Sequence, residues 1–413
     1  MYETVAKLLP RDVKEQIKRH APFLVRKPAP LIKTTEVTEF DRPYIKDGKM
    51  WFHFKPKAKI DTFSISVPDD FSCHNDLIAT CIISIFGGLF KKVRLNFEVS
   101  TECVAVLEEI AGIEISTAGV IEPWQAGTTP FLAFSGGFDS LAGYLLCPGY
   151  YKLASIDFGG IYARERAFFE TLDTTIIETD FRRTGDGSFH WMFMGAPLIL
   201  HADYLNMSGI GFGTIFEAAP VHMQPAEYKH QPMNDFRRAV GLGDYTITKG
   251  LTEFATVRII QKLAPDFAEA SLKSLADEGS EKKYRKELLL RMELVRDGVA
   301  GNEVYDAISL PKNKVKIGKS FALDFLYYAF ASSDAHETVY RVIENPEALK
   351  EFQSTGIDMS WVNAYNPSFI NQIPYDKIGD TMNKLHEIGV PMFSQKDYEN
   401  YSKFREYWFS KNS

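Results

Sequence analysis

Residues 131–143, F-L-A-F-S-G-G-F-D-S-L-A-G, constrain the fold more than any other stretch of the chain. The apolar residues 131–134 predict a short buried strand, and the apolar spacing after Asp139 predicts a helix. Between them, two consecutive glycines permit a tight turn and a close approach of the backbone to an anion. Because the N–H groups that open a helix attract negative charge, this strand, loop and helix together predict a phosphate-binding site.

The side chains of the loop add to this prediction. Ser135 and Ser140 contribute hydroxyl donors, and Asp139 can hold the helix N-terminus, a Mg²⁺ ion or a nucleophile. A tight turn in which serine and aspartate act only as caps is the simpler interpretation of the same residues. A Walker A loop is excluded because no G-K-[ST] follows, and the G-x-G-x-x-G spacing of dinucleotide-binding folds is missing.

The hexapeptide S-G-G-F-D-S at residues 135–140 resembles the PP-loop of the N-type ATP pyrophosphatases. Within that group the closest likeness is to the 7-cyano-7-deazaguanine synthase branch, which residues 156–170 and 194–218 also resemble. The resemblance implies an α/β fold with a doubly wound, mainly parallel five-stranded sheet of the adenine nucleotide alpha hydrolase-like type. It also implies that the loop binds the β- and γ-phosphates of ATP and leaves the α-phosphate open to attack.

The chain departs from that branch at several positions. The glutamine expected near Gly160 and the Pro-Gly-Arg-Asn element expected before the fourth-strand helix are both missing. No cysteine follows Cys147, so the structural zinc site of the synthase is not expected. The lysine usual near the last sheet strand falls, depending on register, at Lys249 or is replaced by Glu253. These departures leave the deazaguanine substrate open.

Repeating strand and helix units predict further strands at residues 152–158, 175–178 and 209–212. In open parallel sheets, ligands bind outside the carboxyl ends of the strands, so the residues that follow each strand are candidates. The expected nucleotide-binding residues are Ser135, Gly136, Gly137, Phe138, Asp139, Ser140, Asp157, Phe158, Gly159, Gly213 and Thr214. The expected substrate residues are Arg164, Glu165, Arg182 and Glu217. The expected catalytic residues are Ser135, Asp139, Ser140 and Lys249.

Simpler interpretations of these polar residues remain open. Each arginine taken alone fits a solvated helix face, and Glu217 fits a capped or paired structural acid. The basic residues of the helix expected over residues 280–295 also fit a solvated face, with nucleic-acid contact as the alternative. These basic residues are Lys282, Lys283, Arg285 and Lys286.

Composition narrows the class of protein. The 413 residues include 47 Lys and Arg against 54 Asp and Glu, a net charge of −7 that argues against a broad nucleic-acid surface. Four cysteines without a C-x-x-C pair indicate free thiols rather than a disulfide framework or a zinc site. The longest apolar run, residues 77–90, is too short to span a bilayer, and we expect a cytoplasmic protein.

Four segments are expected along the chain. They are an N-terminal helix and linker over residues 1–33, a small α+β module over 34–125, an ATP-binding α/β domain over 126–260 and a mostly helical region over 261–413. In the module, strands are expected at 51–54, 62–67 and 93–99, and helices at 76–86 and at 101–111 with Thr101 as N-cap. We assign the module to packing, dimerisation or substrate gating.

The resemblance implies adenylation of a carboxylate or amide oxygen by ATP and Mg²⁺, followed by C–N bond formation with ammonia or an amine. One alternative is a nucleotide-binding subunit or sensor, for example of an anti-phage defence system, with redirected or lost chemistry. Another is a PP-loop enzyme that modifies tRNA. The partners expected are a small-molecule or nucleobase-like substrate, a second copy of the chain in a homodimer, or a protein encoded in the same operon.

Overall fold

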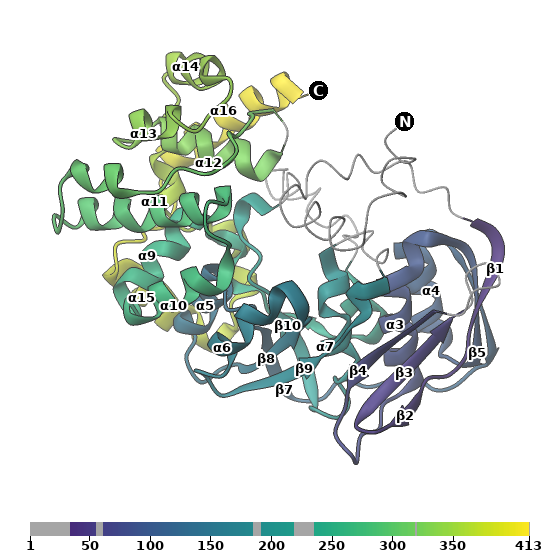
Figure 1. Cartoon of the computed structure of the whole chain (residues 1–413). Helices are drawn as coiled ribbons and strands as arrows, with labels where there is room; N and C mark the ends of the chain where they lie inside the picture. The colour runs from purple at the N-terminus through teal and green to yellow at the C-terminus, as the bar shows by residue number, and fades with distance from the viewer. Residues whose placement is uncertain (1–33, 55–60, 185–190, 219–234, 319, 413) are drawn as a thin grey trace.

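Figure 1 shows a mixed sheet near the N-terminal end, a second sheet in the middle and a group of helices toward the C-terminal end. This computed structural model describes residues 34–54, 61–184, 191–218, 235–318 and 320–412. The helix and linker expected over residues 1–33 lie outside the described residues. In the described part of the chain, no helix is both long enough and apolar enough to cross a membrane.

The N-terminal sheet has six strands in the order β2-β3-β1-β5-β6, with β4 beside β3. Its strands are β1 (Thr34–Phe40), β2 (Tyr44–Lys46), β3 (Lys49–Phe54), β4 (Asp61–Ser66), β5 (Phe90–Glu98) and β6 (Glu114–Gly119). Two helices, α3 (Asn75–Phe86) and α4 (Thr101–Ala111), belong to the same part of the chain. In β3, buried side chains alternate with more exposed ones, because one face of the sheet packs against a core and the other faces solvent.

The cap of α4 differs from the expectation. Thr101 is the first helical residue and is exposed, whereas Ser100 accepts a hydrogen bond from the Cys103 N–H at 3.2 Å. The carboxylate of buried Asp76 holds both the N–H and the hydroxyl of Ser100, at 2.8 and 2.7 Å. The prediction of Thr101 as N-cap was therefore wrong, because a tertiary contact fixes the serine hydroxyl in the capping position.

The central sheet has five strands in the order β11-β10-β7-β8-β9, and every neighbouring pair is parallel. The strands are β7 (Thr129–Ala133), β8 (Lys152–Asp157), β9 (Thr174–Glu178), β10 (Met207–Gly211) and β11 (Gly243–Asp244). The expected α/β class with a parallel sheet is confirmed. From β7, the chain adds β8 and β9 on one side and then β10 and β11 on the other. The strand order therefore reverses between β7 and β10.

Both faces of the central sheet are covered. Leu132 packs in one apolar cluster with α5 (Phe138–Leu146), whereas its neighbour Phe131 packs in another with α7 (Ala196–Leu200). Burial on both faces explains why the strands contain near-continuous apolar runs. The connection that follows β8 is short: a 3-10 segment leads into the single turn α6 (Arg166–Phe169).

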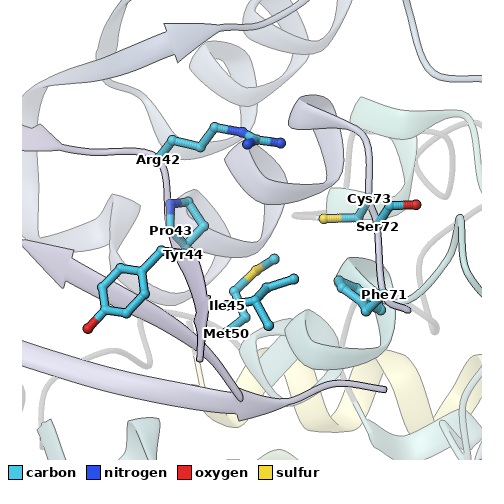
Figure 2. Close-up of a pocket in the computed structure, with 8 residues that line it drawn as sticks. All are labelled: Arg42, Pro43, Tyr44, Ile45, Met50, Phe71, Ser72 and Cys73. Carbon is cyan, nitrogen blue, oxygen red and sulfur yellow. The ribbon is translucent and has the colours of Figure 1, made fainter. Parts of the chain in front are cut away.

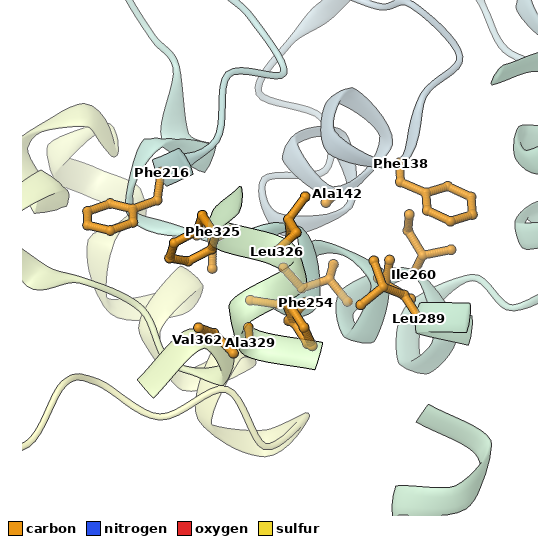
Figure 3. Close-up of a cluster of buried hydrophobic side chains, with 14 of the residues drawn as sticks. Phe138, Ala142, Phe216, Phe254, Ile260, Leu289, Phe325, Leu326, Ala329 and Val362 are labelled. Atoms are coloured by element: carbon orange, nitrogen blue, oxygen red, sulfur yellow. The ribbon is translucent and has the colours of Figure 1, made fainter. Parts of the chain in front are cut away.

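From Glu253 onward, the named elements are α-helices and 3-10 helices. The α-helices are α9 (Glu253–Leu263), α10 (Asp266–Leu275), α11 (Glu281–Arg296), α12 (Phe321–Ala331), α13 (His336–Tyr340), α14 (Pro346–Ser354), α15 (Ile378–Glu387) and α16 (Gln395–Asn412). Figure 3 shows Phe138 of α5 near Ile260 of α9 and Leu289 of α11, all within one buried cluster. The helix that follows the glycine loop is thus embedded among the C-terminal helices.

The two sheets meet where β4 lies beside the end of β9. Ile65 and Thr179 form an antiparallel bridge, and the Ser64 N–H donates to the Asp180 carboxylate at 2.7 Å. The Glu178 N–H donates to the Ser66 hydroxyl at 2.7 Å. One apolar cluster contains residues of the N-terminal module and residues of α7. The module is therefore joined to the edge strand β9 and packs against α7, which covers one face of the parallel sheet.

Candidate functional site

The glycine loop lies at the point where strand order reverses in the central sheet. β7 leads into the loop and α5, and Gly213 follows β10. A Cβ at Gly213 would lie 2.6 Å from the backbone N of Ser140, so the chain after β10 abuts the first turn of α5. This contact requires a glycine whether or not a purine lies nearby. The carboxyl ends of β7 and β10 thus converge on one helix N-terminus, where ligands bind in sheets of this kind.

The loop is held by its own serines. The Ser140 hydroxyl donates to the Gly137 carbonyl at 3.1 Å and lies 3.2 Å from the Ser135 hydroxyl. It also accepts from the Ser135 N–H at 3.3 Å. Ser135 is exposed, and no side chain caps the first turn of α5 at its N-cap, Gly137. An exposed hydroxyl therefore lies beside an uncapped helix N-terminus, an arrangement suited to binding an anion.

Helix α10 covers the other side of the loop. The Ser271 hydroxyl donates to the Gly136 carbonyl at 2.7 Å. Gly136 has φ +71°, and a Cβ there would lie 2.9 Å from the Ser274 hydroxyl. A Cβ at Gly137 would lie 3.0 Å from the Leu275 side chain. Packing against α10 thus accounts for both glycines, and the exposed side of the loop is the side of Ser135.

A buried lysine contacts the aspartate of the loop. The Lys286 ammonium of α11 lies 3.3 Å from Asp139 Oδ1 and 2.7 Å from Glu253 Oε1. Lys286 is only 2% exposed, and its ammonium lies 5.1 Å from the centre of the Phe138 ring. Asp139 Oδ1 also accepts a hydrogen bond from the Thr256 hydroxyl at 2.9 Å. A buried ammonium group thus joins Asp139, at the start of α5, to Glu253 of α9.

Two buried carboxyl groups next to this lysine have opposite pKa shifts. Burial, together with the nearby carboxylates of Glu253 and Asp139, raises the pKa of Glu217 to about 8. Burial also opposes ionisation of Glu253, but Arg285 and Lys286 outweigh it and lower the pKa of Glu253. Glu217 accepts a hydrogen bond from the Glu253 N–H at 2.7 Å, and its Oε2 is buried without a partner. Glu217 is thus protonated at neutral pH and can donate a proton or a hydrogen bond.

The basic residues of α11 do not form a uniformly solvated face. Lys282 is exposed, but Arg285 and Lys286 are buried and paired with Glu253. Their charges can be buried because carboxylates on neighbouring helices neutralise them. The solvated-face interpretation was therefore wrong for Arg285 and Lys286. Arg285 and Lys286 lie four and three residues before buried Leu289, and this helical spacing places them on the side of α11 that faces the core. The spacing is visible in the sequence.

The predicted residues after β8 lie mostly in a network of their own. Asp157 accepts from the Gly159 N–H at 2.8 Å and pairs with Arg166 at 3.0 Å. Gly159 and Gly160 have φ +60° and +55°, and no atom lies within 4 Å of a Cβ at either position. The backbone here is therefore open, as expected for a surface that a flat ring approaches, although this geometry alone also fits a bare turn.

Three of the predicted substrate residues lie in the segments after β8 and β9: Arg164 and Glu165 follow β8, and Arg182 follows β9. Arg164 donates to the Ser274 carbonyl at 2.9 Å and so fastens α10 over the loop, rather than standing free in solvent. Burial raises the pKa of Glu165 to about 7, although Arg164 and Lys282 oppose this shift. The Arg182 guanidinium lies 4.5 Å from the centre of the Tyr162 ring and 5.3 Å from that of Phe158. Arg182 is exposed at the edge of this aromatic group.

Lys249 lies in an ion-pair group at the end of β11. Its ammonium contacts the Asp244 carboxylate and lies 3.4 Å from Gln372 Oε1. Asp244 is also paired with Arg237 at 2.8 Å, and these two cations lower its pKa although burial opposes them. The neighbouring Thr248 hydroxyl donates to the Thr214 carbonyl at 2.8 Å. Among the described residues, the cation in contact with the glycine loop is Lys286, and the role of Lys249 stays a prediction.

The donor set fits a magnesium ion that arrives with phosphates. In the described part of the chain, no group of three or more His, Cys, Asp or Glu side chains is arranged to hold a metal ion. Mg²⁺ needs only one or two protein carboxylates when phosphate oxygens and water supply the rest. Asp139 engages Thr256 and Lys286 through Oδ1, whereas Oδ2 has no hydrogen-bond partner among the described residues. Asp139 can therefore supply one such ligand.

No protein-family model, no curated protein and no solved structure matches the chain.

Proposed function

We propose that the chain binds ATP at the start of α5 and adenylates a carboxylate or amide oxygen, with release of pyrophosphate. Ammonia or another amine then displaces AMP and forms a C–N bond. The observation that carries the proposal is the convergence of β7 and β10 on an uncapped helix start, with exposed Ser135 beside it and Lys286 in contact with Asp139. The strand order supports an adenine nucleotide alpha hydrolase-like sheet, and residues 135–140 support the PP-loop assignment.

In this proposal the loop binds the terminal phosphates. The first-turn N–H groups of α5 and the exposed Ser135 hydroxyl donate hydrogen bonds to phosphate oxygens, whereas the Ser140 hydroxyl, bonded to the Gly137 carbonyl, holds the loop in place. Lys286 stabilises the negative charge of the departing pyrophosphate, because its low-dielectric surroundings strengthen the attraction. Mg²⁺, held by Asp139, would neutralise further phosphate charge.

Glu165 and Glu217 have separate roles in the proposed reaction. Glu165 has a pKa of about 7, which suits a general base that takes a proton from the incoming amine. Glu217 is protonated at neutral pH and has a buried oxygen without a partner, which suits a hydrogen-bond donor to the substrate.

The binding half of the proposal is tested with Mg·ATP and isothermal titration calorimetry. Ser135→Ala removes an exposed donor and is expected to weaken binding about tenfold, the loss typical of one hydrogen bond to a charged group. Asp139→Asn is expected to reduce the Mg²⁺ dependence of binding. Ser354→Ala changes an exposed serine of α14 and serves as the matched control. Absence of ATP binding by the unmodified chain would contradict the proposal.

The chemical half is tested by measuring pyrophosphate release from ATP across a panel of carboxylic acids with ammonium present. Release that depends on both the acid and Asp139 supports adenylation. ATP binding without release across the panel would instead support a nucleotide-binding subunit, and RNA that copurifies with the chain would support the tRNA-modifying alternative.

A further inference from the structure

A pocket of about 330 Å³ lies in the N-terminal module, and none of its lining residues belongs to the glycine loop (Figure 2). It is lined by Arg42, Pro43, Tyr44, Ile45, Met50, Phe71, Ser72 and Cys73. Pro43, Met50 and Phe71 are buried and form an apolar wall. The volume is at the lower end of the range of about 300–1,000 Å³ typical of small-molecule sites. The pocket can therefore hold only a small ligand.

Arg42 supplies the positive charge of the pocket. Its Nε donates to Asn75 Oδ1 at 3.1 Å, and Asn75 in turn donates to the Glu98 carbonyl at 2.9 Å. Within the described residues, no carboxylate forms an ion pair with Arg42, whereas most of the other described arginines have such a partner. The hydrogen bond at Nε orients the guanidinium and leaves its terminal N–H groups for a ligand. A planar guanidinium recognises a carboxylate with two parallel hydrogen bonds.

Acidic residues near the pocket already have partners. Asp203 accepts from the Trp124 indole N–H at 3.2 Å, and Asp70 accepts from the Tyr204 hydroxyl at 3.1 Å. The pocket lining itself includes no acidic residue. The indole and hydroxyl donors are uncharged, so Asp203 and Asp70 keep their negative charges, and the first turn of α3 already carries the carboxylate of Asp76. The Arg42 guanidinium is therefore the group that attracts an anion to the pocket.

Cys73 contributes a neutral wall rather than a nucleophile. Figure 2 shows its sulfur on the pocket side of the chain. Burial raises the pKa of the Cys73 thiol to about 12, and the opposing effect of Arg42 is smaller. The thiol is thus protonated at neutral pH, and a protonated thiol behaves as a small apolar group.

We propose that this pocket binds a small monocarboxylic acid with an apolar body. The carboxylate pairs with the Arg42 guanidinium, and the hydrocarbon chain or ring packs against Met50 and Phe71, with Ile45 at the edge. The inference does not rest on the proposed adenylation, because the pocket shares no residue with the glycine loop.

The test compares acids with their neutral analogues in isothermal titration calorimetry on the full chain. Hexanoate and benzoate are expected to bind at least about tenfold more tightly than hexanol and benzyl alcohol. Arg42→Gln is expected to remove this preference, and Ile45→Glu to abolish binding of both acids by placing a negative charge at the rim. Lys46→Gln, a substitution of an exposed cation on the same strand outside the lining, is expected to leave binding unchanged.

Hydrogen exchange of the backbone amides in residues 42–50, followed by mass spectrometry, supplies an independent measurement, because three of the lining residues that the ligand contacts lie in this segment. Hexanoate is expected to slow exchange there in the unmodified chain but not in Arg42→Gln. Equal affinity for hexanoate and hexanol, unchanged affinity in Arg42→Gln, or no binding at millimolar concentration would each overturn the proposal. Because Arg42 and Ile45 are exposed, neither substitution threatens the fold.

Discussion

Gly136 has a structural requirement that is separate from any ligand. Its φ of +71° lies in the left-handed region, and a Cβ would lie 2.9 Å from the Ser274 hydroxyl and 3.0 Å from the Phe168 ring. We therefore expect Gly136→Ala to lower the free energy of unfolding by about 2 kcal/mol, from backbone strain plus steric overlap. Urea denaturation measures the change.

Gly149→Ala is the matched control for this substitution. Gly149 has φ +75°, but no atom lies within 4 Å of a Cβ there, so only backbone strain of about 1 kcal/mol is expected. Equal losses in the two variants would show that α10 does not press on the loop as the structure indicates.

The protonation of Glu217 links stability to pH. Its pKa in the folded chain is about 8, above the ordinary value of 4.5. A raised pKa means that the stability contributed by Glu217 is complete below pH 4.5 and is lost as the pH rises through about 8. Relative to Glu217→Gln, the unmodified chain should therefore lose up to about 5 kcal/mol of unfolding free energy across this window, because each pKa unit corresponds to about 1.4 kcal/mol. Urea denaturation of both proteins at a series of pH values measures the difference, and parallel pH profiles would contradict the assignment.

At the scale of elements, the start of α9 depends on Thr252. This residue is 1% exposed; its hydroxyl accepts from the Ala255 N–H and donates to the Val362 carbonyl. Thr252→Val keeps the shape but removes both bonds, so we expect a loss of about 2 kcal/mol of unfolding free energy. Ser280→Ala, at the cap of α11, removes one bond and should cost about 1 kcal/mol. Thermal and urea denaturation compare the two, and equal costs would argue against the tertiary bond to Val362.

The N-caps of α9 and α4 show when a helix cap can be predicted from the sequence. Thr252 directly precedes an apolar periodic segment, with no rival candidate beside it, and it caps α9. The cap of α4 could not be assigned in the same way, because Ser100 and Thr101 are adjacent and equally suitable in sequence. The carboxylate of Asp76, 24 residues away from Ser100, selects the serine. The N-cap of a helix can be predicted from the local sequence only where a single candidate residue is present.

At the scale of the whole molecule, the two sheets share an apolar core. Leu198 of α7 is fully buried in the cluster that also contains residues of the N-terminal module. Leu198→Ala should therefore lower the free energy of unfolding by about 3 kcal/mol and shift a single transition that both parts share. Calorimetry and hydrogen exchange test this expectation, with exposed Val120→Ala as the control. Two separate transitions would contradict a shared core.

The sequence by itself determined the strand, glycine loop and helix, and the parallel α/β architecture around them. These features depend on local patterns, because apolar runs, turn residues and helix signals act over a few residues. For the same reason Ser135, Asp139 and Ser140 could be selected as a group without any knowledge of the fold.

Only the tertiary structure decided which groups surround that loop. Lys286 is 147 residues from Asp139 in the chain, and the two meet because α11 packs beside α9 and α5 in one core. The same packing buries Glu217 and Glu253 and moves their pKa values in opposite directions. Contacts between distant segments follow from how helices pack together, and a local pattern cannot specify them.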